Sequence, residues 1–176
     1  GKNNEDNQAR SGGFRMAGGI FGLLLGASFT YFMLTGVRYA GTVSELDRLT
    51  QYVSGKIDAS SREPIFAKLK LWIDSSQIGQ WHQKIDFLND PVEANAAKLA
   101  IVKEENLEKF ATMTSQQGVE FIPDAIPVDP AIQRAYDRRN FGALLRNEAI
   151  QKKLRETFTE EQLRQLDIEG ELGLRK

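Results

Sequence analysis

Residues 16–37 read MAGGIFGLLLGASFTYFMLTGV, and this stretch decides the architecture of the chain. It contains no charged residue, no Asn, no Gln and no Pro. As an α-helix it spans about 33 Å at ~1.5 Å per residue, enough to cross a hydrocarbon core of ~30 Å. A buried core helix and a cleaved signal peptide are the two alternatives. The length and glycine content of the stretch disfavour the first, and its long apolar run disfavours the second. We therefore predict a single transmembrane helix.

The residues that flank this helix are suited to the membrane surfaces. Arg15 and Arg38 bracket the uncharged stretch, and both side chains are long enough to reach lipid headgroups. Tyr39 follows Arg38, at a position where an interfacial aromatic side chain is favoured. We expect Arg15, Arg38 and Tyr39 to anchor the helix at the membrane interfaces. The basic residues on the two sides are too similar in number to predict the orientation of the helix.

Small residues occupy one face of the predicted helix. Three glycines are spaced by four residues, and a fourth glycine and a threonine fall within the same third of the helix surface at ~100° per residue. These five residues are Gly18, Gly19, Gly22, Gly26 and Thr30. Such a face lets a second helix approach closely, so we predict a helix partner there. The alternative is that glycine is simply common in membrane helices. Whether the partner is a second copy of this chain stays open.

The expected fold is all-α, with a single N-terminal transmembrane helix followed by an extended multi-helix extramembrane region that includes a Pro-rich strap. Residues 65–73 alternate enough to allow a strand, but without a partner strand we favour an amphipathic helix lying on protein or headgroups. The predicted segments are a polar tail at 1–15, the transmembrane helix at 16–37, a helix continuing from the membrane at 38–55, a linker with short amphipathic helices at 56–89, a long helix at 90–118, the strap at 119–130, C-terminal helices at 131–168 and a tail at 169–176.

Local signals set several of these boundaries. Gly55 is suited to end the helix that leaves the membrane. Asp90 precedes a proline and is a strong N-cap for the long helix, on whose wet side we expect Lys98. Thr159 begins a capping box for the last helix. The final residues, EGELGLRK, are polar and contain glycine, so we expect the tail to fray.

The Pro-rich strap reads FIPDAIPVDP and keeps the chain extended between two helices. Its apolar side chains need a surface on which to be buried. That surface is either the helices of the same chain or a neighbouring subunit, and both alternatives stay open. The residues expected to make this contact are Phe121, Ile122, Pro123, Ile126, Pro127 and Val128.

The composition excludes much catalytic and metal chemistry. The 176 residues include 23 basic and 24 acidic residues, so no net charge favours a nucleic-acid partner. There is no Cys and one His, which excludes disulfides, thiol nucleophiles and conventional two-His metal motifs. His82 has Asp86 one helical turn away, but no catalytic motif accompanies the pair. We therefore expect no catalytic residue, no cofactor and no metal.

This layout, a glycine-faced N-terminal anchor followed by charged helices, is similar to that of single-pass accessory subunits of mitochondrial energy-transducing complexes. The membrane-dimerising accessory subunits of ATP synthase share it. The resemblance covers residues 16–50 and is one of architecture. It implies a subunit of the mitochondrial inner membrane, in ATP synthase or the respiratory chain, whose partners are other subunits and membrane lipid. The alternatives are a membrane-tethered adaptor that recruits a soluble partner and, least favoured, a membrane-anchored enzyme.

Overall fold

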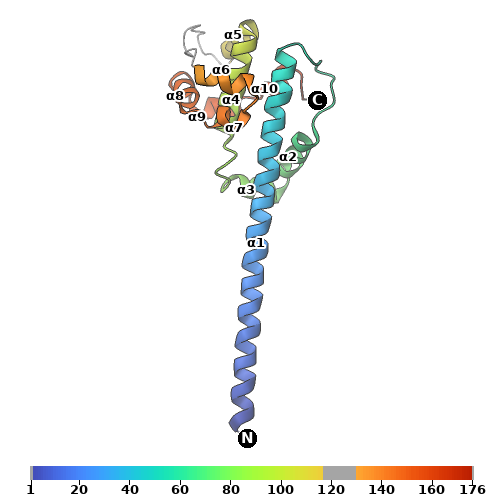
Figure 1. Ribbon diagram of the computed structural model, residues 1–176, viewed down its shortest axis with the longest axis vertical. Helices are drawn as coiled ribbons and strands as arrows, with labels where there is room; N and C mark the ends of the chain where they lie inside the picture. Colours follow the sequence, from blue (N-terminus) through green and yellow to red (C-terminus); the bar gives the residue numbers. More distant parts are fainter. Residues whose placement is uncertain (1, 117–129, 176) are drawn as a thin grey trace.

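The computed structural model describes residues 2–116 and 130–175, apart from the side chains of 2–17, 116, 131 and 132, and all regular structure in this part of the chain is helical (Figure 1). The predicted all-α fold is therefore confirmed. The first helix, α1, runs from Lys2 to Val53. The others are α2 (Ile65–Ser75), α3 (Gln77–Gln83), α4 (Pro91–Glu105), α5 (Leu107–Gln116), α6 (Pro130–Asp137), α7 (Phe141–Leu145), α8 (Glu148–Thr157), α9 (Glu160–Gln165) and α10 (Ile168–Glu171).

Helix α1 has two environments along its length. Residues 18–30 are exposed throughout, whereas the side chains from Tyr31 onward begin to pack against other helices. Figure 1 shows this as a rod whose N-terminal half projects from the remaining helices. Among the described residues, α1 is the one helix long and apolar enough to cross a membrane. It ends just before Gly55, whose φ of 70° is a backbone conformation that favours glycine, as the sequence predicted.

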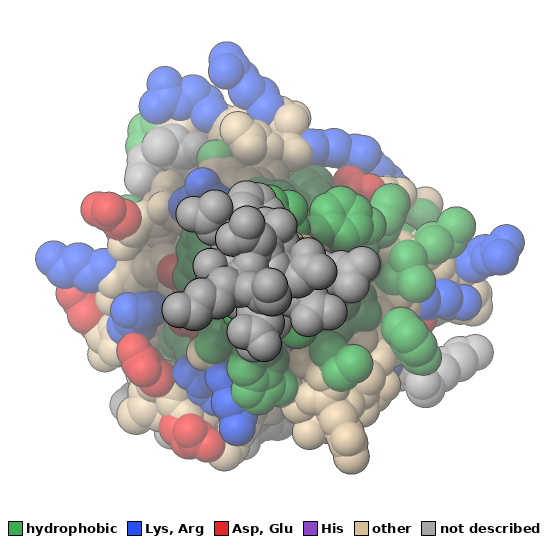
Figure 2. Space-filling model, turned by 90° about the horizontal axis from the view of Figure 1, so that it is seen from below, with side chains coloured by type: hydrophobic (Ala, Val, Ile, Leu, Met, Phe, Trp, Pro, Cys, Tyr) green, Lys and Arg blue, Asp and Glu red, His purple; other side chains and the backbone are tan. Residues whose placement is uncertain are grey.

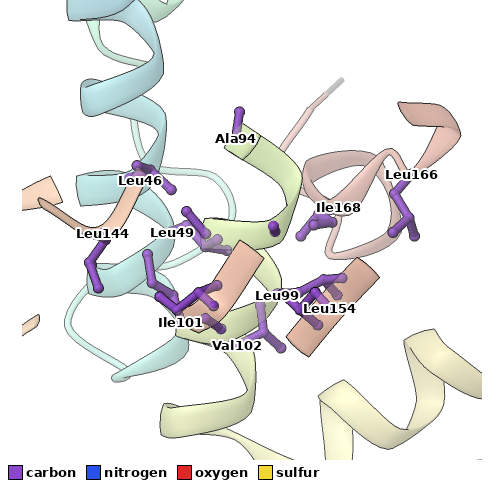
Figure 3. Packing of buried hydrophobic residues seen from close by; sticks show 14 of the residues in the cluster. Leu46, Leu49, Ala94, Leu99, Ile101, Val102, Leu144, Leu154, Leu166 and Ile168 are labelled. Carbon is purple, nitrogen blue, oxygen red and sulfur yellow. The ribbon is translucent and has the colours of Figure 1, made fainter. Parts of the chain in front are cut away.

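The C-terminal half of α1 and helices α4–α10 share one hydrophobic core, and α2 and α3 pack along α1 beside it. We call all of this part the helical domain. Helix α4 lies at its centre, with Leu99 and Ile101 almost completely buried. Leu46 and Leu49 of α1 approach α4 from one side, and Leu154 of α8 packs against it from another (Figure 3). Because α1 supplies part of this core, the domain is fixed directly to the helix that could cross the membrane.

Helix α2 runs antiparallel to α1, because its later residues meet earlier residues of α1. Lys70 reaches Glu45, whereas Asp74 reaches Arg38. The two helices approach closely at Gly41, where a Cβ would lie 2.5 Å from the Cβ of Lys70. Residues 65–73 are thus helical, as favoured above, and α3 continues toward the exposed half of α1 (Figure 1).

Two boundaries differ from the sequence prediction. The long helix expected at 90–118 is divided at Asn106, whose extended backbone ends α4 and whose side chain caps α5 by accepting from the backbone N–H of Lys109. The tail does not fray, because α10 forms within it and Leu174 is buried. The guanidinium of Arg48 donates to the Leu174 carbonyl oxygen at 2.9 Å, which fixes the C-terminal residues against α1. The predicted caps at Asp90 and Thr159 are both present.

Candidate functional site

The predicted helix-contact residues all lie on the part of α1 that projects from the domain. The exposed residues are Gly18, Gly19, Gly22, Gly26 and Thr30. A Cβ added at any of the four glycines would meet no heavy atom within 4 Å among the described residues. The Thr30 hydroxyl donates to the Gly26 carbonyl oxygen at 2.9 Å, so its polar group is satisfied within α1. Because α1 is continuous here, the five residues share one open face of small side chains.

Of the three predicted membrane anchors, Arg38 has a different position from the one expected. Arg15 lies outside the described side chains. Arg38 does not extend toward headgroups, because its side chain is 4% exposed and pairs with Asp74 and Asp86. Burial without partners would leave a charge uncompensated, so these two carboxylates explain why the guanidinium turns inward. Tyr39 is half-buried and packs against the core of the domain.

A buried polar cluster surrounds α1 where the domain begins. We call it the juxtamembrane cluster, and its members are Thr35, Arg38, Asp74, His82, Asp86 and Asn89. Arg38 donates from Nε to Asp74 at 2.7 Å and from Nη1 to Asp86. Asn89 donates to Asp86 at 2.7 Å and to the Thr35 carbonyl oxygen at 3.3 Å. These bonds tie α2, α3 and the following loop to α1.

The histidine belongs to this cluster and is enclosed by it. His82 is 2% exposed, and its Nε2 lies 3.1 Å from the Thr35 hydroxyl and 3.3 Å from the Tyr31 carbonyl oxygen. Its Nδ1 lies 3.4 Å from an Asp86 oxygen that also accepts from Arg38. Acid–base catalysis requires a histidine that substrate can reach, and this ring is packed against α1. The geometry therefore assigns His82 to holding α3 on α1.

A second set of buried charges lies deeper in the domain, and sequence reasoning placed one of them incorrectly. We call it the charge network, and its members are Glu45, Lys70, Lys98 and Glu169. Lys98, expected on a wet helix face, is 3% exposed and lies 2.8 Å from Glu45 while also pairing with Glu169. Lys70 lies 2.8 Å from the same Glu45 oxygen. The partners come from α1, α2 and α10, so no local pattern on α4 could reveal them.

The charge network changes the pKa of its members according to their partners. Burial by itself would raise the pKa of Glu45, which lies about two helical turns beyond the uncharged stretch, but Lys98 and Lys70 bring it to about 2. Burial would lower the pKa of Lys98, but the two carboxylates around it raise that pKa above its usual value. Lys70 has one carboxylate partner, and burial keeps its pKa below its usual value. Glu45 and Lys98 are therefore held as a charged pair.

The structure does not describe the predicted contact strap, because residues 117–129 lie outside the described ranges. Among the side chains that the structure describes, no three from His, Asp or Glu are grouped as metal ligands would be. The candidate site is thus an open face of small residues on α1, with the juxtamembrane cluster beyond its C-terminal end. Comparisons of the chain with protein-family models, with curated proteins and with solved structures find no match.

Proposed function

We propose that this protein is a single-pass accessory subunit of a larger membrane protein complex, held there by the glycine face of α1. The observation that carries the proposal is the open face of Gly18, Gly22 and Gly26, which has no packing partner among the described residues. Glycine weakens a helix and offers little contact area to lipid, so a lone anchor has no use for it. Against another helix, the same face permits close backbone approach and dispersion contacts.

An apolar surface beyond the membrane supports the proposal independently. On α2, Ile65 and Leu69 are one helical turn apart and are 68% and 40% exposed. They are not the side that packs on the domain, because the buried residues of α2 are Ala67 and Ile73, and Lys70 points inward to Glu45. Ile65 and Leu69 flank the part of α1 that lies beyond the uncharged stretch. A neighbouring subunit that packs on α2 would cover them.

The proposal includes a location. The architecture of residues 16–50 favours the mitochondrial inner membrane and an energy-transducing complex, ATP synthase or a respiratory-chain complex. In this role the chain binds and positions neighbours and carries no catalytic step. Subcellular fractionation of the tagged full chain, followed by identification of the proteins that co-purify in mild detergent, tests this part directly. Recovery in another membrane would refute the location without bearing on the glycine face.

The glycine face is tested by adding bulk to it. Gly22→Leu and Gly26→Leu place a side chain where the isolated chain has open space, so they should not disturb the fold of the monomer. Leucine also has a higher helix propensity than glycine, by roughly 1 kcal/mol. Any loss of assembly would therefore report on a partner helix. The expected result is release of both variants from the complex on native gels in mild detergent.

Two control variants sharpen this experiment. Ala27→Leu adds the same bulk to α1 at a position about 120° from the middle of the glycine face, and it should co-migrate with the complex as the wild type does. Gly22→Ala keeps the side chain small and should also assemble. Unchanged co-migration of both leucine variants would refute the glycine face as the contact. Release of the Ala27→Leu variant as well would show that α1 tolerates no added bulk and would remove the specificity of the claim.

A further inference from the structure

Part of the helical domain lies at the same level as the apolar half of α1. The Tyr31 hydroxyl donates to the Ile85 carbonyl oxygen at 3.1 Å, and the Tyr31 and His82 rings are 5.1 Å apart. Thr35 contacts His82 as well. Tyr31 and Thr35 belong to the uncharged stretch that ends at residue 37, and Tyr31 lies about 9 Å inside that end at ~1.5 Å per residue. A bilayer centred on the uncharged stretch must therefore also meet α3 and the loop after it.

Several of the exposed side chains of α3 and this loop are large and apolar. Ile78 and Trp81 of α3 are 67% and 66% exposed, and Phe87 of the loop is 73% exposed. Phe32 and Met33 of α1 are exposed as well, at 67% and 53%. Figure 2, seen from the N-terminal end of α1, shows hydrophobic side chains gathered around that helix and Lys and Arg side chains projecting at the periphery. An apolar surface of this kind is rare on a soluble protein.

Three polar side chains of this region point inward, whereas Gln77, Gln80, Gln83 and Lys84 are exposed. His82, Asp86 and Asn89 all turn toward α1 and are bonded within the juxtamembrane cluster. Part of the loop backbone is bonded internally too, because the N–H of Ile85 donates to the His82 carbonyl oxygen and the N–H of Leu88 donates to the Asp86 carboxylate. Irregular backbone survives near hydrocarbon where its hydrogen bonds are made internally.

From this arrangement we infer that α3 and residues 84–88 are immersed in the membrane, at the headgroup layer and the outermost hydrocarbon of the leaflet where α1 emerges. The exposed Gln80 and Gln83 of α3 and the exposed Lys84 that follows it match headgroups and limit the depth. The occupant of this surface is lipid, because α3 and the loop contact α1 at Tyr31, inside the uncharged stretch that is apolar enough to cross a membrane. The inference rests on α1 crossing the membrane, but it does not depend on the glycine face or on any partner subunit.

The two tryptophans of the chain lie at different depths in this arrangement. Trp81 belongs to α3, beside the uncharged stretch. Trp72 belongs to α2 and lies between Lys70 and Asp74. Those two residues contact α1 at Gly41, Glu45 and Arg38, which all follow the uncharged stretch, so Trp72 lies nearer the water. Both side chains are exposed, at 66% and 71%. Tryptophan is favoured at the interface between headgroups and hydrocarbon, and its fluorescence reports how deep it lies.

The test uses the purified full chain in phosphatidylcholine vesicles that carry bromine either near the carbonyl end or near the methyl end of the acyl chains. Trp72→Phe and Trp81→Phe leave one native reporter each. The fluorescence of Trp81 should be quenched strongly by the shallow bromines and less by the deep ones. Quenching of Trp81 by the shallow bromines should also be stronger than that of Trp72. A third chain carries Trp72→Phe, Trp81→Phe and Leu24→Trp. Its reporter lies on the exposed side of α1 and should be quenched most by the deep bromines.

The outcomes separate this inference from the claim that α1 spans the bilayer. One outcome is that Leu24→Trp is quenched by deep bromines, while Trp81 is quenched by aqueous acrylamide and by neither of the two brominated lipids. In that case α1 does cross the bilayer, and the inference that α3 is immersed is overturned. If Trp81 is protected from both lipid and acrylamide, a second copy of the chain covers it, and the inference is again overturned. If Leu24→Trp is not quenched by lipid, α1 does not span and both claims fail.

Discussion

Lys98→Met should destabilise the helical domain by about 3–5 kcal/mol, because it removes one partner from a buried set of charges. The Lys98 side chain is 4% exposed, with its ammonium 2.8 Å from a Glu45 oxygen and also paired with Glu169. Methionine keeps the hydrocarbon stem, so the loss is mainly electrostatic. Glu45 would retain Lys70 at 2.8 Å, whereas Glu169 would retain Arg175 at the longer distance of 3.8 Å. The stranded Glu169 carboxylate accounts for most of the effect.

Lys70→Met is the matched control, since it removes an ammonium from the same Glu45. The Lys70 side chain is 13% exposed, and Glu45 would keep Lys98 as its partner. No carboxylate is then left without a close cation. The expected cost is that of a charged hydrogen bond, about 1.5–3 kcal/mol. The order of the two variants, with Lys98→Met the less stable, is the result that the geometry requires.

Urea unfolding of the full chain in mild detergent, followed by far-ultraviolet circular dichroism, measures both values. With a slope of ~2 kcal/mol per molar, the Lys98→Met midpoint should fall by about 1.5–2.5 M. A Lys98→Met variant within about 0.5 kcal/mol of the wild type would behave like an ordinary surface substitution. That result would refute the view that the charge network is buried and shielded from water.

Three further predictions concern the same domain. Folding lowers the pKa of Glu45 from 4.5 to about 2, so its stabilisation of roughly 3 kcal/mol is present above pH 4.5 and is lost as the pH falls toward 2. Urea unfolding over this range should show the loss in the wild type and a smaller one in Glu45→Gln; equal losses would refute the assignment. Gly41→Ala should destabilise by about 1–3 kcal/mol, because its Cβ would lie 2.5 Å from that of Lys70, whereas Gly36→Ala meets open space and should not destabilise. Thermal unfolding compares the two, and equal midpoints would contradict the close approach of α1 and α2. Leu174→Ala should cost about 2–5 kcal/mol, since Leu174 is 3% exposed, and should speed proteolysis of the C-terminal residues; unchanged cleavage would mean that they do not pack.

Features with a local physical cause could be predicted from the sequence. The uncharged stretch predicts a membrane-crossing helix through its length and composition, and Gly55 predicts where that helix ends. The caps at Asp90 and Thr159 satisfy backbone groups within three residues of themselves, so they too can be recognised without a fold. The glycine face is equally local, because a helical period of 3.6 residues places its members together. Its role as a contact remains a prediction.

Features that depend on distant partners could not be predicted. Arg38 next to an apolar stretch suggests a headgroup anchor, yet Asp74 and Asp86 make burial favourable for it. Lys98 suggests a solvent-facing side of its helix, yet it is buried, because Glu45 and Glu169 lie next to its ammonium. In both cases the charged side chain by itself is more stable in water than in the interior. Its burial becomes possible only when folding brings opposite charges next to it.

The sequence by itself determined that the chain has an apolar helix able to cross a membrane, a face of small residues on that helix, and further helices beyond it. The tertiary structure decided which charges are buried and which apolar side chains stay exposed. It placed His82 and Asp86 against α1, and it left Trp81 and Phe87 facing outward at the level of the uncharged stretch. The physical reason is that hydrophobic periodicity describes one helix at a time, whereas burial of a charge depends on carboxylates and cations that only the folded chain brings together.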